Sequence, residues 1–179
     1  MRQLVASFLL ASISVACSGE GTRLEDVEGP FSWGAVSNVT HVGRLWFAGQ
    51  PDAETLRKAK ENGLRVVLNL RDPSESEWDE RSAVEDLGMV YYNVPVQKTG
   101  PFTRESFSRI DALLEDHEED QILIHCSSSN RAGGWFATYL VEKRGMSVDE
   151  ALAIGRETGI TKDAIASRVL AYLGEPADG

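Results

Sequence analysis

Apolar stretches alternate with polar, helix-forming stretches along most of the chain. Two of the apolar stretches, residues 64–70 and 121–125, are nearly continuous runs, as expected of strands buried on both faces of a parallel sheet. Short β-branched or aromatic stretches separated by Gly43 predict a strand pair, and a further strand ends near Pro95. The predicted strands are residues 36–40, 44–47, 64–70, 89–96 and 121–125.

Helices are predicted between these strands from their capping residues. Asp52, Thr103 and the Ser147–Glu150 capping box favour helix starts, and glycines favour the ends. The predicted helices are residues 53–62, 77–87, 131–144 and 161–173, together with one that runs from Thr103 to the acidic cluster at 115–120 and one that starts at Ser147. This alternation predicts an α/β fold with a mainly parallel central sheet flanked by helices, in which ligands bind beyond the carboxyl ends of the strands.

The first sixteen residues predict a signal peptide. Arg2 precedes an apolar run over residues 4–13, and small residues over 14–16 favour cleavage before Cys17. An N-terminal Cys17 resembles the acylated cysteine of a bacterial lipoprotein, with simple secretion as the alternative. We therefore expect an exported protein, periplasmic or anchored to a bacterial membrane through lipidated Cys17. Residues 17–30 would then be a tether, 31–174 a single domain and 175–179 a tail.

Charge and cysteine content limit the partners and cofactors that the chain is expected to have. The formal net charge is −10, and loss of Arg2 with the signal takes it to about −11, which argues against nucleic acid as a partner. Large polyanions would need a local basic pocket. The chain has two cysteines, so lipidation of Cys17 leaves Cys126 without a disulfide partner. His41 and His117 lack ligand spacing, and no metal or other cofactor is expected.

The candidate chemistry lies in His125-Cys126-Ser127-Ser128-Ser129-Asn130-Arg131, where a predicted strand passes through a tight loop into a helix. In such a loop the backbone N–H groups and the helix dipole converge on one anion. The same positive field favours the thiolate of Cys126, which is the nucleophilic form. Arg131 adds a planar fork that suits two phosphate oxygens.

Four segments in order resemble the β-lactamase-hydrolase-like protein phosphatase family. They are residues 49–51 (Gly-Gln-Pro), 67–71 (Val-Leu-Asn-Leu-Arg), 93–96 (Asn-Val-Pro-Val) and the loop from His125 to Arg131, and the resemblance covers roughly residues 36–173. It implies a dual-specificity-phosphatase-like fold and a protein-tyrosine-phosphatase-like hydrolase. The implied substrates are phosphate monoesters, on a phosphorylated protein or a small molecule, with aryl phosphate or phosphotyrosine-like esters cleaved through a phosphocysteine.

On this reading Cys126 and Arg131 are catalytic, and substrate contacts come from Ser127, Ser128, Ser129, Asn130, Arg71 and His125. Arg71 has a salt bridge to Asp72 or Glu75 as its alternative role, and His125 is expected to order the loop rather than transfer protons. Ser129 stands where a loop glycine is usual, which matters if a positive φ is needed.

The source of the leaving-group proton is less evident. Residues 97–102, the loop that usually carries the acid, contain no carboxylate. Asp72 is the candidate general acid, with Glu75 and Glu77 as alternates, although Asp-Pro is also ordinary turn chemistry.

Two other functions remain open from local details of the loop. Four residues separate Cys126 from Arg131, a spacing that also occurs in rhodanese-like sulfurtransferases. Ala132 stands where a hydroxyl often helps the thiolate to leave. Ala132 and the unassigned acid together favour another alternative, a catalytically weak anion-binding module.

Overall fold

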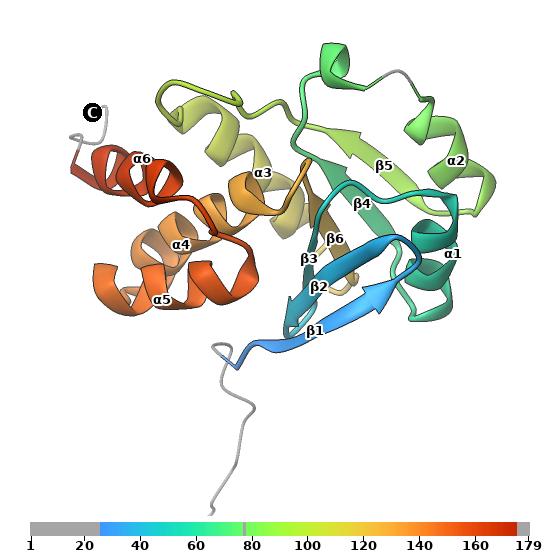
Figure 1. Cartoon of the computed structure of the whole chain (residues 1–179), viewed down its shortest axis with the longest axis horizontal. Helices are drawn as coiled ribbons and strands as arrows, with labels where there is room; N and C mark the ends of the chain where they lie inside the picture. The colour runs from blue at the N-terminus through green and yellow to red at the C-terminus, as the bar shows by residue number, and fades with distance from the viewer. Residues whose placement is uncertain (1–25, 77, 175–179) are drawn as a thin grey trace, which may run out of the picture.

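A six-stranded sheet forms the centre of the computed structural model, which describes residues 26–76 and 78–174 (Figure 1). Its order is β1-β2-β3-β6-β4-β5. The β1/β2 and β2/β3 pairs are antiparallel, whereas β3/β6, β6/β4 and β4/β5 are parallel. The strands are β1 (Glu28–Trp33), β2 (Val36–Val42), β3 (Leu45–Ala48), β4 (Val66–Asn69), β5 (Val90–Asn93) and β6 (Ile122–His125).

Helices cover both faces of this sheet. Figure 1 shows α1 and α2 on one side of the sheet and α3, α4, α5 and α6 on the other. They are α1 (Ala53–Glu61), α2 (Glu80–Asp86), α3 (Arg104–Asp116), α4 (Asn130–Arg144), α5 (Val148–Thr158) and α6 (Asp163–Gly174), with a short 3₁₀ helix η1 (Pro73–Glu75) after β4. The predicted α/β architecture with a mainly parallel sheet is confirmed.

Side chains of the central strands alternate between two apolar cores. Leu68 of β4 and Ile124 of β6 pack with the helices α3 to α6, while Val67 and Leu123 pack on the side of α1 and α2. Burial on both faces explains why these strands read as continuous apolar runs rather than alternating ones. Trp135, Phe136 and Leu140 of α4 belong to the first core.

Several element boundaries differ from expectation, and β1 was not predicted. It begins at Glu28, inside the segment expected to be tether, and only its last residue, Trp33, is buried. An exposed edge strand that contains Gly29-Pro30 lacks the apolar alternation by which strands are recognised. Helix α2 starts at Glu80 rather than near residue 77, because Asp79 caps it by accepting the N–H of Ser82 at 3.1 Å.

Some expectations fall on residues that the structure does not describe. These are the signal peptide, Cys17 and the tether as far as residue 25, the tail at 175–179, and the alternate acid Glu77. In the described part of the chain, no helix is long and apolar enough to cross a membrane.

Candidate active site

Three neighbouring strands end at the same edge of the sheet, and their following loops form the site. β6 leads into Cys126, β4 leads into Arg71, and β3 leads into Gly49. Gly49 forms a bridge with Ser128, and the N–H of Gln50 donates to the carbonyl of Ser127 at 3.4 Å. The loop after β3 therefore supports the loop that carries the cysteine.

The turn into α4 is made by Ser129, the residue of the predicted loop that stands in place of glycine. Its φ of 63° lies in the left-handed region, which is costly for a side chain other than glycine. The buried hydroxyl donates to the carbonyl of Thr158 at 2.8 Å and makes no cap to α4. The first N–H groups of α4 are thus left without a side-chain cap, as an anion-binding helix start requires.

A cavity of about 660 Å³ opens above this loop, and Cys126 and Arg131 both line it. Cys126 is only 1% exposed and Arg131 only 3%, so the thiol and the guanidinium lie at the floor of the cavity. Ser127, Ser128 and Asn130 line it as well. The structure thereby brings together five of the predicted site residues.

Arg131 is held by the carboxylate of Glu75. Its Nη1 and Nη2 lie 2.7 Å and 2.8 Å from the two carboxylate oxygens, and Nη1 also donates to the carbonyl of Val96 at 2.9 Å. Glu75 and Val96 thus accept from both N–H groups of Nη1 and from one N–H of Nη2. The Nε–H and the second Nη2–H are the donors that can face an anion. Burial alone would lower the pKa of Arg131, but Glu75 and Cys126 raise it, and the side chain stays charged.

Glu75 is ionised and is therefore unsuited to the acid role considered for it. The hydrogen bond from Arg131 lowers the pKa of Glu75 from 4.5 to about 2, although burial opposes this shift. Arg71 also contacts Glu75, with its Nε 3.7 Å from a carboxylate oxygen and its Nη2 on the Glu75 carbonyl. Arg71 Nη1 donates to Gln50. The salt bridge considered for Arg71 is thus present, and Arg71 is not among the residues that line the cavity.

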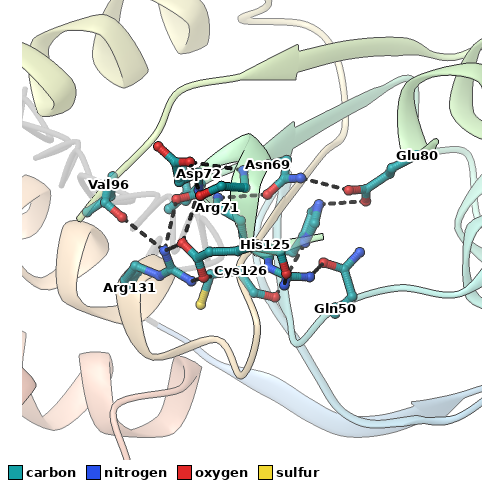
Figure 2. A network of polar contacts seen from close by, with 12 residues as sticks. Gln50, Asn69, Arg71, Asp72, Glu80, Val96, His125, Cys126 and Arg131 are labelled. Atoms are coloured by element: carbon teal, nitrogen blue, oxygen red, sulfur yellow. Dashed lines mark hydrogen bonds and ion pairs between the residues drawn. The ribbon is translucent and has the colours of Figure 1, made fainter. Parts of the chain in front are cut away.

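His125 faces away from the cavity, into a buried polar network (Figure 2). Its Nε2 lies 2.8 Å from a carboxylate oxygen of Glu80, and both side chains are buried. The other oxygen of Glu80 accepts a hydrogen bond from Asn69 at 2.7 Å, and the amide oxygen of Asn69 accepts the N–H of Arg71 at 2.7 Å. In Figure 2 this network runs from Arg131 at one end to Glu80 at the other. His125 is therefore placed to order the loop from behind.

Asp72 is exposed and serves as the N-cap of η1. Its carboxylate accepts the N–H and the hydroxyl of Ser74 at 2.9 Å and 2.6 Å, and the hydroxyl in particular lowers the pKa of Asp72. Asp72 is not among the residues that line the cavity above Cys126. The acid role of Asp72 stays a prediction, and this placement gives it no contact with Cys126 or Arg131.

Comparison with known proteins decides the family. The family model described as "DSP-PTPase phosphatase fused to NAD+ Kinase" matches residues 23–171, which include the whole site described above. The chain belongs to this family. The match covers most of the sequence and agrees with the resemblance drawn from the four segments named in the sequence analysis.

Two relatives of this DSP-PTPase family member are beta-lactamase hydrolase-like proteins. Beta-lactamase hydrolase-like proteins of two Xylella fastidiosa strains, Temecula1 and 9a5c, are each 31% identical over 123 residues, which is 65% of this chain. The match spans 28% of those relatives' own length. The predicted resemblance to the β-lactamase-hydrolase-like phosphatases is confirmed.

Solved structures share the fold. Tk-PTP in its active form is 23% identical with a TM-score of 0.62, and the match covers 73% of this chain and 91% of that chain. TpbA of P. aeruginosa, solved in complex with pTyr, is 18% identical with a TM-score of 0.61, and the match covers 76% and 83%. The fold is that of tyrosine and dual-specificity phosphatases, as the sequence predicted.

Proposed function

We propose that this DSP-PTPase family member hydrolyses phosphate monoesters through a phosphocysteine on Cys126. The single observation that carries this is the placement of Cys126 and Arg131 on the floor of one cavity, at the uncapped start of α4. The thiolate of Cys126 attacks phosphorus and the bond to the alcohol or phenol oxygen breaks, so that the leaving group departs with the bonding electrons and takes up a proton. Water then attacks the phosphocysteine, and the P–S bond breaks to release phosphate.

Arg131 would bind the phosphoryl oxygens while Glu75 holds it from the other side. Its free Nε–H and Nη2–H lie along one edge of the guanidinium, which suits two oxygens of the transferring group. Such preorganised donors are typically worth about 10²–10³-fold in rate. The N–H groups at the start of α4 would bind the same charge.

Aryl phosphates are the proposed preferred substrates. The loop over residues 97–102 contains no carboxylate, and Asp72 is occupied as a helix cap. General acid catalysis contributes about 10²–10⁴-fold when a donor is in place. With a weak or distant proton donor, phenol-type leaving groups, including phosphotyrosine, are cleaved more readily than alkyl ones. Binding of pTyr by TpbA, which shares the fold, supports this choice.

The experiment compares hydrolysis of p-nitrophenyl phosphate by wild type, Cys126→Ser and Arg131→Ala. We expect Cys126→Ser to remove turnover and Arg131→Ala to lower kcat/KM by at least about 10²-fold. Arg81→Ala is the matched control, since Arg81 lies exposed on α2, contacts Glu85 and Tyr91, and is not among the residues that line the cavity. Turnover that survives in both site variants would contradict the proposal.

A quenched-reaction mass measurement tests the intermediate itself. Acid quenching during turnover should trap a phosphate adduct on the peptide that contains Cys126. Incubation with thiosulfate should leave that peptide unchanged. A sulfur adduct without a phosphate adduct would instead identify a rhodanese-like sulfurtransferase.

We also propose export through the N-terminal segment, with acylation at Cys17. Wild type should incorporate a fatty acid in a bacterial host and fractionate with membranes, whereas Cys17→Ser should be soluble in the periplasm. Wild type recovered without acylation would contradict the lipoprotein assignment.

A further inference from the structure

The cavity above Cys126 carries more positive charge than one phosphate group requires. Besides Arg131, its lining includes Lys98, Lys162 and Arg168, and none of the residues that line it is acidic. The chain as a whole has a formal net charge of −10. The net negative charge of the protein repels anions at long range. The four cations around this cavity create a local positive field that favours anions there.

Lys162 is fixed to the anion loop through Asn130. The side-chain oxygen of Asn130 accepts the N–H of Thr161 at 3.0 Å and the N–H of Lys162 at 3.2 Å. Asn130 itself is the first residue of α4 and lines the cavity. The backbone of Lys162 therefore keeps a set position relative to the loop that holds the scissile phosphate.

Arg168 and Lys98 are joined across the cavity wall. The guanidinium of Arg168 donates to the carbonyls of Gln97 and Lys98 at 2.8 Å and 3.3 Å, and its centre lies 3.9 Å from the centroid of the Phe102 ring. These contacts fix the guanidinium against the loop that contains Lys98. Arginine has five N–H donors, so three remain beyond these two hydrogen bonds.

Arg168 and Arg131 line the same cavity, so their positive charges repel each other. Burial lowers the pKa of Arg168 first, and the positive charge of Arg131 lowers it further. An anionic group between the two guanidinium groups would relieve this repulsion and gain attraction from both. The cavity thus has a second position, beside the phosphate loop, at which negative charge is favoured.

We propose that Lys98, Lys162 and Arg168 form a second anion subsite, and that the substrate is a small phosphate monoester that carries a second phosphate group. This deepens the proposed function and rests on it. A cavity of about 660 Å³ is of the size that encloses small molecules. Ala164, Ile165 and Pro101 give it an apolar wall against which the carbon framework between the two phosphates would pack.

The test measures binding to the Cys126→Ser variant, so that it does not depend on turnover. Calorimetry compares phenyl phosphate with para-phenylene bisphosphate, which has the same ring and a second phosphate. We expect the bisphosphate to bind at least about tenfold more tightly, since a charge-assisted contact is worth about that factor. This exceeds the about twofold statistical gain from its two equivalent ends.

Two variants locate the preference within the cavity. Lys98→Gln together with Lys162→Gln removes two exposed charges without touching the core, and we expect it to lower the bisphosphate preference to about threefold or less while phenyl phosphate binding changes little. Lys58→Gln, on α1 at the other face of the sheet, should leave the preference unchanged. Arg168→Lys keeps the charge and should keep most of the preference.

The outcomes separate the two proposals. Equal affinity for both ligands, or a preference that survives the double variant, overturns the second subsite and leaves the proposed phosphatase function intact. Failure of both ligands to bind overturns the phosphate site at Cys126 and Arg131 as well.

Discussion

Replacement of Glu75 by glutamine tests whether the ion pair with this carboxylate holds Arg131 in place. Glutamine keeps the size of the side chain and one acceptor oxygen but removes the charge opposite Arg131. Lowering a carboxyl pKa from 4.5 to about 2 corresponds to about 3 kcal/mol of folding free energy at neutral pH, because each pH unit is about 1.4 kcal/mol. The Glu75 side chain is 16% exposed, so solvent screening reduces this to about 2 kcal/mol.

The pH dependence has a defined sign. The pKa of Glu75 is lower in the folded state than in the unfolded chain, so the stability it supplies is complete above about pH 4.5 and is lost as the pH falls toward 2. We expect Glu75→Gln to be about 2 kcal/mol less stable than wild type at neutral pH, with the difference shrinking in acid. Urea unfolding followed by tryptophan fluorescence at neutral pH and near pH 3 measures both values.

Glu85→Gln is the matched control for this experiment. Glu85 also faces an arginine, Arg81, at 3.1 Å, but its side chain is 53% exposed. Exposed pairs of this kind contribute about 0–1 kcal/mol. If Glu75→Gln were no less stable than Glu85→Gln at neutral pH, or if its deficit persisted unchanged in acid, the ion pair would not hold Arg131 as described.

Three further changes test the loop and the proton donor. Ser129→Ala should cost about 1–2 kcal/mol in urea unfolding, because it removes the buried hydrogen bond to Thr158 and keeps the positive φ; a cost below that of Ser129→Gly would contradict this account. Gly133→Ala should destabilise by about 1–3 kcal/mol in thermal unfolding, because its Cβ would lie 2.8 Å from the Gly155 carbonyl; an unchanged melting temperature would show that α4 and α5 separate freely. If Asp72 donates the proton, Asp72→Asn should slow hydrolysis of phenyl phosphate by about 10²-fold and spare p-nitrophenyl phosphate; equal effects on both substrates would remove Asp72 from the mechanism.

Local signals in the sequence were enough for the fold and for placing the cysteine loop between a strand and a helix. Continuous apolar runs identified the buried strands β4 and β6, and Thr103 and Ser147 were found as caps because their hydrogen bonds reach only three residues along the chain. The cysteine loop was found in the same way, since strand, loop and helix follow one another directly. Each of these features depends on residues that are close together in the sequence.

Partners from distant segments were not predictable in this way. Glu75 and Arg131 are 56 residues apart in the chain, and the sequence around Glu75 indicated only the nearby Arg71 as a partner. Glu80, at the start of α2, likewise meets His125 and Asn69 only in the folded chain. The basic wall of the cavity is assembled from the segments around Lys98 and Lys162, which meet only in the folded state.

The hydrogen bonds of Asn130 to the segment before α6 have a consequence for how such an enzyme would change its substrate during evolution. Asn130 is the first residue of the helix that follows Cys126, and its amide group also sets the backbone position of Lys162. Exposed side chains on the cavity wall are then free to vary, so new selectivity can arise there without disturbing reactivity. A replacement of Asn130 would alter both properties at once, which makes this position a constraint on divergence rather than a route to it.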